Sequence, residues 1–403
     1  MARLKTALRE RWHIAAVVAL VLGVSVAGVV KATASDGAAP TQAYSVTDMG
    51  TLGGSFAFAF AVNNRSQATG VSTLPGDIVV HGFLWQSGAM TDLGTLGGSF
   101  VQANSINDRT QIVGIATLPG DQNVHAFLWQ NGVMTDLGTL GGTDSQAWWI
   151  NNAGQVAGDS MTANGEDHAF LWDHGVMTDL GTLGGARSVA FGIDDTGRVV
   201  GASAISDARS CGPGDPGTFA GCHAFQSDHG MMTDLGTLGG SWSVANPSNN
   251  RGDVIGFSSL RGDANYAAFR DSYGTMRPLL PVAGDPNSVA NGANDRGQIV
   301  GASGDEIFDV SPNRAVLWQD GAGTDLNSVI LANSPLYLLW AFGINETGQI
   351  VGEGVTADGS AHPFLLTPIG NGAAGTGRSS MHGLRVTMPA AMQRALHHRA
   401  PGH

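Results

Sequence analysis

Residues 146–158 read Gln-Ala-Trp-Trp-Ile-Asn-Asn-Ala-Gly-Gln-Val-Ala-Gly, residues 168–172 read His-Ala-Phe-Leu-Trp, and residues 177–185 read Met-Thr-Asp-Leu-Gly-Thr-Leu-Gly-Gly. Together these three segments form one unit that recurs along the chain. The glycine that closes the first segment marks each copy: Gly70, Gly114, Gly158, Gly201, Gly256, Gly301 and Gly352. Successive copies lie about 44 residues apart, with longer steps after Gly201 and Gly301. Self-similarity at this period indicates a repeat architecture of seven units.

Each unit contains four short runs rich in Val, Ile, Thr, Phe and Trp, and turn residues bound each run. Such runs predict β-strands, and Asn-Gly-rich stretches such as 151–154 predict tight hairpins. Four strands in about 40–45 residues is the size of a propeller blade. We therefore expect an all-β fold, a seven-bladed β-propeller of four-stranded antiparallel blades, over residues 44–369.

The two ends of the repeat array predict how the ring closes. The first recognisable element, 46–52, resembles a fourth strand, and the last, 362–366, resembles a third strand. The last blade lacks a fourth strand of its own. We expect the N-terminal strand to complete it, which closes the ring non-covalently.

Three motifs link the chain to a known family: His125-Ala126-Phe127-Leu128-Trp129, the stretch 134–142, and the stretch 106–114. They resemble the HAF-repeat family of bacterial extracellular proteins over about residues 44–366. The resemblance implies an exported bacterial protein and no particular reaction or ligand. The fifth unit departs from the pattern, with Ala267 in place of His and Pro278 in the fourth strand. Because proline cannot donate to a ladder, we expect that strand at an outer edge.

The first 34 residues differ from the rest. A basic start precedes 17 uncharged apolar residues, 14–30, and Ala32-Thr33-Ala34 follows. This pattern predicts a secretory signal peptide, and an uncleaved transmembrane helix that anchors the chain is the alternative. Residues 35–43 would form a linker, and residues 370–403 a disordered basic tail. Both alternatives place the propeller outside the cytoplasm by the general secretory route, as a secreted, cell-surface or periplasmic protein.

The composition limits the partners. The chain has 403 residues, 59 of them glycine, and a net charge of −13. Residues 35–369 hold 11 of the 20 basic residues and 32 of the 33 acidic residues. Such an acidic surface repels nucleic acid but permits cationic partners. We expect a monomer that meets a membrane only through an uncleaved N-terminal segment.

Two side chains repeat from unit to unit. Histidine opens the third strand at His81, His125, His168, His223 and His362. Aspartate follows Thr in the fourth strand at Asp48, Asp92, Asp136, Asp179, Asp234 and Asp325. These residues could form metal ligands or general acids. Repeated positions spread around a circle, however, whereas a site must converge, so we interpret both sets as structural hydrogen-bonding groups.

The loops between second and third strands vary most and bear an acid each. We expect these loops on one face together with the interblade crossings, and that face is the predicted binding surface. We expect no cofactor. The alternative is that the carboxylates of these loops bind Ca²⁺ weakly. The weak metal candidates are Asp77, Asp121, Asp167, Asp263, Asp305 and Asp358.

The chain has two cysteines, Cys211 and Cys222, and both lie in the longest of these loops. In an exported protein we expect them to form a disulfide.

Three functions fit the sequence. The first is a non-catalytic propeller that binds an unknown protein or glycan. The second is a secreted hydrolase or lyase with its active site over the central channel, for which Asp194-Asp195 and Asp305-Glu306 are the candidates. The third is a structural repeat of a surface assembly. We favour the first, because we find no hydrolase signature such as Gly-x-Ser-x-Gly.

Overall fold

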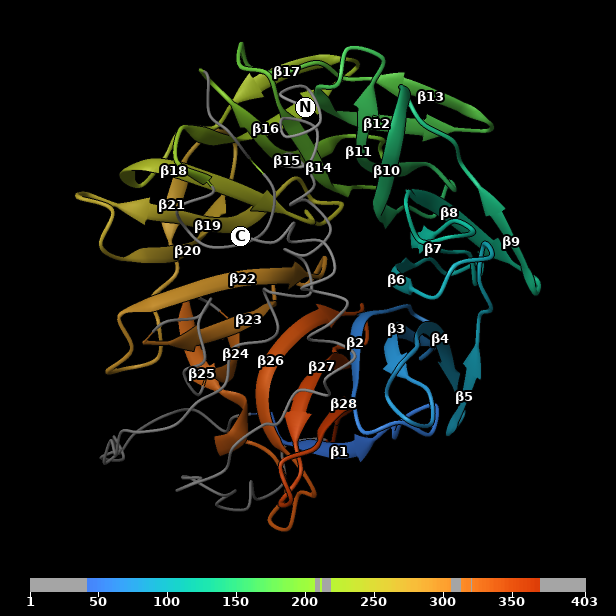
Figure 1. Ribbon diagram of the computed structural model, residues 1–403. Helices are drawn as coiled ribbons and strands as arrows, with labels where there is room; N and C mark the ends of the chain where they lie inside the picture. Colours follow the sequence, from blue (N-terminus) through green and yellow to red (C-terminus); the bar gives the residue numbers. More distant parts are fainter. Residues whose placement is uncertain (1–41, 207–210, 212–218, 306–312, 320, 370–403) are drawn as a thin grey trace, which may run out of the picture.

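The structure is a computed structural model that describes residues 42–206, 211, 219–305, 313–319 and 321–369. Seven four-stranded antiparallel sheets surround a common axis, which confirms the predicted fold class (Figure 1). None of the described residues belongs to a helix with the length and hydropathy of a bilayer-spanning segment. The predicted signal or anchor segment and the predicted tail lie outside the described residues.

Each blade runs from an inner first strand to an outer fourth strand. Blade 1 is β2 (Ala57–Val62), β3 (Ala68–Thr73), β4 (Val80–Gln86) and β5 (Ala89–Asp92). Blade 2 is β6 (Val101–Ile106), β7 (Ile112–Thr117), β8 (Val124–Gln130) and β9 (Val133–Asp136). Blade 3 is β10 (Gly141–Ile150), β11 (Val156–Thr162), β12 (Asp167–Asp173) and β13 (Val176–Asp179). Blade 4 is β14 (Ser188–Ile193), β15 (Val199–Ala204), β16 (Cys222–Asp228) and β17 (Met231–Asp234).

The remaining blades follow the same plan. Blade 5 is β18 (Gly239–Asn246), β19 (Val254–Leu260), β20 (Tyr266–Asp271) and β21 (Met276–Pro278). Blade 6 is β22 (Asn287–Ala293), β23 (Ile299–Gly304), β24 (Arg314–Gln319) and β25 (Ala322–Asp325), followed by a 3-10 turn at Leu326–Ser328. Blade 7 is β26 (Tyr337–Ile344), β27 (Ile350–Val355), β28 (Ala361–Pro368) and β1 (Tyr44–Asp48). Pro278 lies in an outermost strand, as predicted.

Blade 7 contains both ends of the described chain. Strand β1 pairs antiparallel with β28, from Tyr44 opposite Pro368 to Asp48 opposite Phe364. It is the outer strand of a sheet whose other three strands are the last in the chain (Figure 1).

The repeated glycine holds the two inner strands of each blade together. Gly70 and Gly114 pair with Ala59 and Ala103 of the first strand, and a bulge follows each alanine. A Cβ atom on any of the seven repeated glycines would lie between 1.8 and 2.0 Å from a first-strand carbonyl oxygen. Glycine is therefore required here by close backbone approach.

Apolar side chains fill two kinds of space. Seven clusters each join one pair of neighbouring blades; the cluster of Ala61, Leu84, Val101 and Trp129, for example, joins blades 1 and 2. One larger cluster, the central cluster, includes Phe58, Val71, Val244 and Trp340 and draws on every blade except blade 3. Because it spans so many blades, the central cluster must lie around the axis.

Candidate functional site

A hollow of about 620 Å³, part of it open to solvent, lies where the first strands turn into the second strands. Two consecutive residues of each turn lie at this hollow; the second lines it in all seven blades, and the first lines it in every blade except blade 6. The first residues, here called the buried ring, are Asn63, Asn107, Asn151, Asp194, Asn249, Asn294 and Asn345. The second residues, here called the mouth ring, are Asn64, Asp108, Asn152, Asp195, Asn250, Asp295 and Glu346, and all seven line the hollow. The mouth ring therefore surrounds one end of the central channel.

The buried ring joins each blade to the next. Asn63 first fixes its own turn, because its Oδ1 accepts the N–H groups of Arg65 and Gln67. Its Nδ2 then donates to the backbone oxygen of Asn107, 2.9 Å away in blade 2. The same interblade bond recurs around the circle and returns from Asn345 to Asn63.

Asp194 interrupts the buried ring, because a carboxylate has no hydrogen to donate. It pairs instead with Arg198 of its own turn, at 2.6 Å. The sequence analysis named Asp194 and Asp195 together as a catalytic candidate, and this contact gives Asp194 a structural role. The described residues thus give Asp194 a structural partner inside blade 4.

The mouth ring forms an unbroken circle of hydrogen bonds. The N–H of Asn64 donates to Asp108 Oδ1 at 2.8 Å, and each following residue donates to the side-chain oxygen of the next blade. The circle ends with Asp295 donating to Glu346 and Glu346 donating to Asn64 Oδ1. All seven bonds measure between 2.7 and 3.0 Å. Backbone donors therefore orient every side chain of the mouth ring.

Neutral amides and carboxylates alternate around the mouth ring except at Asp295 and Glu346, which are neighbouring acids. Asparagine Nδ2 groups donate to the flanking carboxylates, and Asn250 contacts both Asp195 and Asp295. Burial raises the pKa of Glu346, the Asp295 N–H opposes this, and the negative charges of Asp295 and Asp108 raise it further. Burial is the main cause of this raised pKa, Asp295 and Asp108 add to it, and the charge of Arg296 opposes it. A cationic group at the mouth would therefore be favoured beside these carboxyl groups.

Arginines border the mouth ring on the same turns. Arg251 donates to the backbone oxygen of Asp295 in the next blade, at 2.9 Å. Arg109 and Arg296 lie over glycines of the next blade, where Cβ atoms on Gly154 and Gly348 would meet them at 2.9 and 2.6 Å. The mouth therefore offers acceptor oxygens at its centre and guanidinium groups around them.

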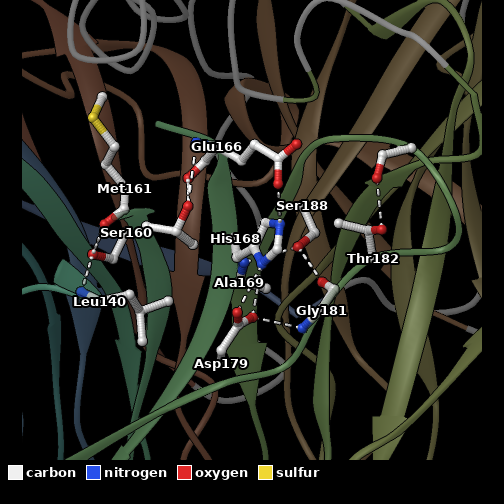
Figure 2. Close-up of polar contacts among 12 residues, drawn as sticks. Leu140, Ser160, Met161, Glu166, His168, Ala169, Asp179, Gly181, Thr182 and Ser188 are labelled. Carbon is white, nitrogen blue, oxygen red and sulfur yellow. Dashed lines mark hydrogen bonds and ion pairs between the residues drawn. The ribbon is translucent and has the colours of Figure 1, made fainter. Parts of the chain in front are cut away.

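The repeated histidines and aspartates lie elsewhere, between the third and fourth strands. Each His Nδ1 contacts the Asp eleven residues later, or Asp48 for His362, at 2.7–2.9 Å. Figure 2 shows the pair of His168 and Asp179, whose carboxylate also accepts the N–H of Gly181. In blade 6, Arg314 replaces His and pairs with Asp285 at 2.8 Å, while its distance to Asp325 is 3.9 Å.

A serine of the following blade completes this contact. Ser188 Oγ donates to Gly181 O at 2.6 Å and accepts the N–H of Ala169 at 2.8 Å (Figure 2). The same arrangement recurs at Ser145 and Ser243. The His and Asp side chains thus pair within one blade, whereas the Ser side chain joins that blade to the next. The Ser hydroxyl donates to a carbonyl and not to the imidazole.

The six loop acids stay in separate blades. Asp77 accepts from Thr73 Oγ1 and from the N–H and hydroxyl of Ser55, and Asp121 repeats this with Thr117 and Ser99. Asp263 accepts the Ser241 N–H, and that bond, with one from Ser259, holds the pKa of Asp263 below its ordinary value. These carboxylates therefore fix the interblade crossing to the loop.

The other three loop acids have their own contacts. Asp167 pairs with Arg187 at 3.0 Å, and Asp358 accepts from Thr356 and Ser360. The backbone oxygen of Asp305 accepts from Asn287, and Glu306 lies outside the described residues. Across the described ranges, no three His, Cys, Asp or Glu side chains gather closely enough to hold a metal ion.

Cys211 and Cys222 form the predicted disulfide, with their Cα atoms 5.7 Å apart. Both cysteines are buried in the central cluster together with Phe219 of the same loop. The Phe219 ring lies 5.7 Å from Trp242 and 5.8 Å from Phe257. The disulfide therefore fixes part of this loop against the core.

The hollow lies on the face opposite the predicted binding surface. The loops between second and third strands adjoin the crossings, as the bond from Gly54 N to Thr73 O shows. The mouth ring lies at the other end of the first strands. Sequence reasoning singled out only Asp195 of its residues, as half of the Asp194-Asp195 catalytic candidate, and interpreted the others as turn signals. The available signal was the position after the repeated Asn, which is always Asn, Asp or Glu.

Comparisons with known proteins support the fold alone. No family model matches the chain. No curated protein matches it either. A puromycin-hydrolysing peptidase of Mycobacterium tuberculosis is 12% identical with a TM-score of 0.53, over 81% of this chain and 54% of the peptidase. The β-propeller domain of the Trilobed protease from Pyrococcus furiosus is 8% identical with a TM-score of 0.51, over 81% of this chain and 99% of the domain. The chain thus spans about half of the mycobacterial peptidase and is similar to both in being a β-propeller.

Proposed function

We propose that the chain is an exported, non-catalytic β-propeller that binds a cationic, hydroxyl-bearing ligand, such as an amino sugar, at the mouth ring. The main support is the unbroken circle of backbone N–H bonds that holds seven polar side chains around one hollow. A preorganised ring of acceptor oxygens needs no rearrangement to receive a ligand with N–H and O–H donors.

The contacts of the acids favour binding over hydrolysis. A hydrolase needs a nucleophile, or two carboxyl groups whose surroundings separate their pKa values. In the mouth ring the four acids occupy equivalent positions, and each accepts a backbone N–H. Such fixed acceptors suit recognition better than proton transfer.

Export is the second part of the proposal. The disulfide supports an oxidising compartment. The basic, apolar N-terminal segment and the resemblance to HAF-repeat proteins support the same location. The intact mass of protein recovered outside the cytoplasm will show whether residues 1–34 are removed. Recovery of reduced protein from the cytoplasm alone would contradict export.

The binding test removes charge without removing acceptors. In the quartet Asp108→Asn, Asp195→Asn, Asp295→Asn and Glu346→Gln, every backbone N–H keeps its oxygen partner, as it does at Asn64, Asn152 and Asn250. Isothermal titration uses a glucosamine tetramer and its neutral N-acetylated form. We expect the unaltered chain to prefer the cationic tetramer, and the quartet to lose at least about tenfold in affinity, or ~1.4 kcal/mol.

A control variant that loses the same number of negative charges separates the effect of the mouth ring from the effect of the net charge of the protein. Glu166→Gln, Asp228→Asn, Asp305→Asn and Asp358→Asn remove four exposed acids that do not line the hollow. This control should retain the affinity for the cationic tetramer. If the control and the quartet lose the same affinity for the cationic tetramer, the loss comes from the change in net charge and not from the mouth ring. Equal binding of both tetramers, or of neither, would refute the ligand class.

A role in a surface assembly is the second candidate, because apolar side chains are exposed on the outer strands of three consecutive blades. Val133, Val176 and Met231 are 63%, 64% and 75% exposed. A triple change of these residues to Thr should release proteins that co-purify with the chain. Unchanged co-purification would argue against this candidate, whatever the result at the mouth ring.

A further inference from the structure

Blades 2 and 3 place polar side chains where other blades place apolar ones. Gln102 and Gln146 each precede the alanine that pairs with the repeated glycine, so they occupy the same position in neighbouring blades. Their counterparts in four other blades belong to the central cluster: Phe58, Val244, Val289 and Trp340. Blade architecture therefore does not require glutamine here.

The two glutamines belong to a buried polar group together with Asn104, Trp148 and Asp159. Gln102 is 0% exposed and Gln146 is 4% exposed. Burying polar atoms costs about 1–3 kcal/mol for each group that forms no hydrogen bond. Two of these residues, Gln102 and Gln146, each bury an oxygen that accepts no hydrogen bond, and this cost calls for a functional explanation.

In this group the side-chain N–H donors form hydrogen bonds, whereas two side-chain oxygen acceptors have no donor. Gln102 Nε2 donates to Asn104 Oδ1 at 2.7 Å, and Asn104 Nδ2 donates to Ala147 O at 2.8 Å. Gln146 Nε2 lies 3.4 Å from Asp159 Oδ2, and Trp148 Nε1 donates to Asp159 Oδ1 at 2.6 Å. The Oε1 atoms of Gln102 and Gln146 are buried and accept no hydrogen bond.

The partners fix the orientation of both amides. Turning Gln146 over would place its oxygen against the Asp159 carboxylate. Turning Gln102 over would place its oxygen against Asn104 Oδ1, and Asn104 cannot turn because its amide donates to Ala147 O. The two remaining atoms are therefore acceptors, and they need a donor.

We propose that Gln102 and Gln146, with Asp159 and Trp148 beside them, form an internal binding site for a primary ammonium group. An ammonium has three donors and no acceptor, which matches two free amide oxygens next to a carboxylate. The rings of Trp148 and Phe191, 5.8 Å apart, add an aromatic surface that favours a cation and its apolar stem. The ammonium comes from a small free amine or from a lysine side chain of a peptide.

This site is separate from the mouth ring in residues and in ligand requirement. The mouth ring offers carboxylates and neutral amides to a hydroxyl-bearing ligand, whereas the internal site has two amide oxygens for N–H donors. The mouth quartet should therefore leave the internal site intact. Failure of either proposal does not decide the other.

The test uses the disulfide-bonded chain and three probes at matched ionic strength: ethylammonium, the peptide Gly-Lys-Gly, and tetramethylammonium, which has no N–H donor. Ethylammonium should raise Tm by about 2 °C near saturation. It should also shift the indole N–H resonance of Trp148, which lies within the site. Tetramethylammonium should do neither. Whichever of ethylammonium and the peptide binds more tightly identifies the source of the ammonium.

The double variant Gln102→Val/Gln146→Val adopts the residue that blades 4, 5 and 6 have at this position, Val189, Val244 and Val289. It should lose the response to ethylammonium. Glu353→Gln, a change of another buried side chain in blade 7, should retain it. An equal response to tetramethylammonium, an unshifted Trp148 resonance, or an undiminished response in the double variant would overturn the proposal. The resonance test on the unaltered chain holds even if the double variant does not fold.

Discussion

Glu353 shows how far one residue can depart from the repeat. It follows the repeated glycine of blade 7, a position held by Val71, Ile115, Ala202, Phe257 and Ala302 in five other blades. All five belong to the central cluster. Glu353 is 1% exposed, its Oε2 accepts no hydrogen bond, and burial raises its pKa well above 4.5.

Replacing Glu353 by Val should stabilise the chain at neutral pH by about 1–3 kcal/mol. The folded chain holds this proton more tightly than the unfolded chain, so the contribution of Glu353 is full below about pH 4.5. It is lost as pH rises through the folded pKa. Denaturant unfolding at pH 4.5 and pH 8 should show this loss in the unaltered chain and a smaller one in Glu353→Val.

Glu353→Gln is the matched control, because it keeps the shape and removes the titration. It should show the same reduced pH dependence as Glu353→Val. If all three chains lose stability in parallel between the two pH values, Glu353 is not the titrating group.

At the scale of the element, the pair of inner strands depends on the repeated glycine. Gly114→Ala would place a methyl group 1.9 Å from Gln102 O, and that backbone cannot move without breaking the bulge. We expect a loss of about 3 kcal/mol or more in unfolding free energy. Gly132→Ala is the control, since its Cβ meets nothing within 4 Å and only its φ of 83° opposes it. That change should cost about 1 kcal/mol, and equal losses would refute the close-approach argument.

Sequence comparison among the blades predicted the elements better than the site. A glycine that recurs every 44 residues with short β-rich runs beside it defines strands, because the pattern is local. The mouth ring joins residues such as Asn64 and Asp108, whose contact depends on the closed circle. The predicted binding surface lies on the face opposite the hollow, because the sequence does not show that the turns between first and second strands meet in one circle. Gln102 and Gln146 were visible as polar exceptions, but nothing in the sequence showed which atoms lacked partners.

At the scale of the whole molecule, contacts between blade 1 and blade 7 close the ring of blades. Asn345 donates to Asn63 O, and the Glu346 N–H donates to Asn64. Within blade 7, His362 of β28 pairs with Asp48 of β1 at 2.9 Å. The hydrogen bond that His362 donates to Asp48 raises the pKa of His362, burial opposes this, and the Asp48 charge adds to it.

The pairing of β1 should therefore depend on pH. Burial alone would raise the pKa of Asp48, but the bonds from His362 and Gly50 outweigh it and lower that pKa below 3.8. The His362 contribution is full below about pH 6.5 and is lost as pH rises through its raised folded pKa. The Asp48 contribution is full above about pH 4 and is lost as pH falls through its lowered folded pKa. Between these limits the pair should add about 0.5–1 kcal/mol.

Hydrogen exchange of residues 44–48 measures this pairing directly. Exchange should accelerate from pH 6 to pH 8.5, after correction for intrinsic rates, and His362→Gln should remove most of the acceleration. His125→Gln, which removes a pair within one hairpin, should leave residues 44–48 unaffected. Acceleration of the same size in His362→Gln would show that another group controls β1.

The pairing of β1 with β28 also brings the ends of the propeller together. The Ile369 N–H donates to Ala43 O at 2.9 Å, so both ends leave the ring at one point. A short peptide could join them there, and a new opening could be cut in a crossing between two other blades. The blade that combines strands from both ends is therefore fixed only by where the chain starts. In circularly permuted chains, any of the seven blades could take that place.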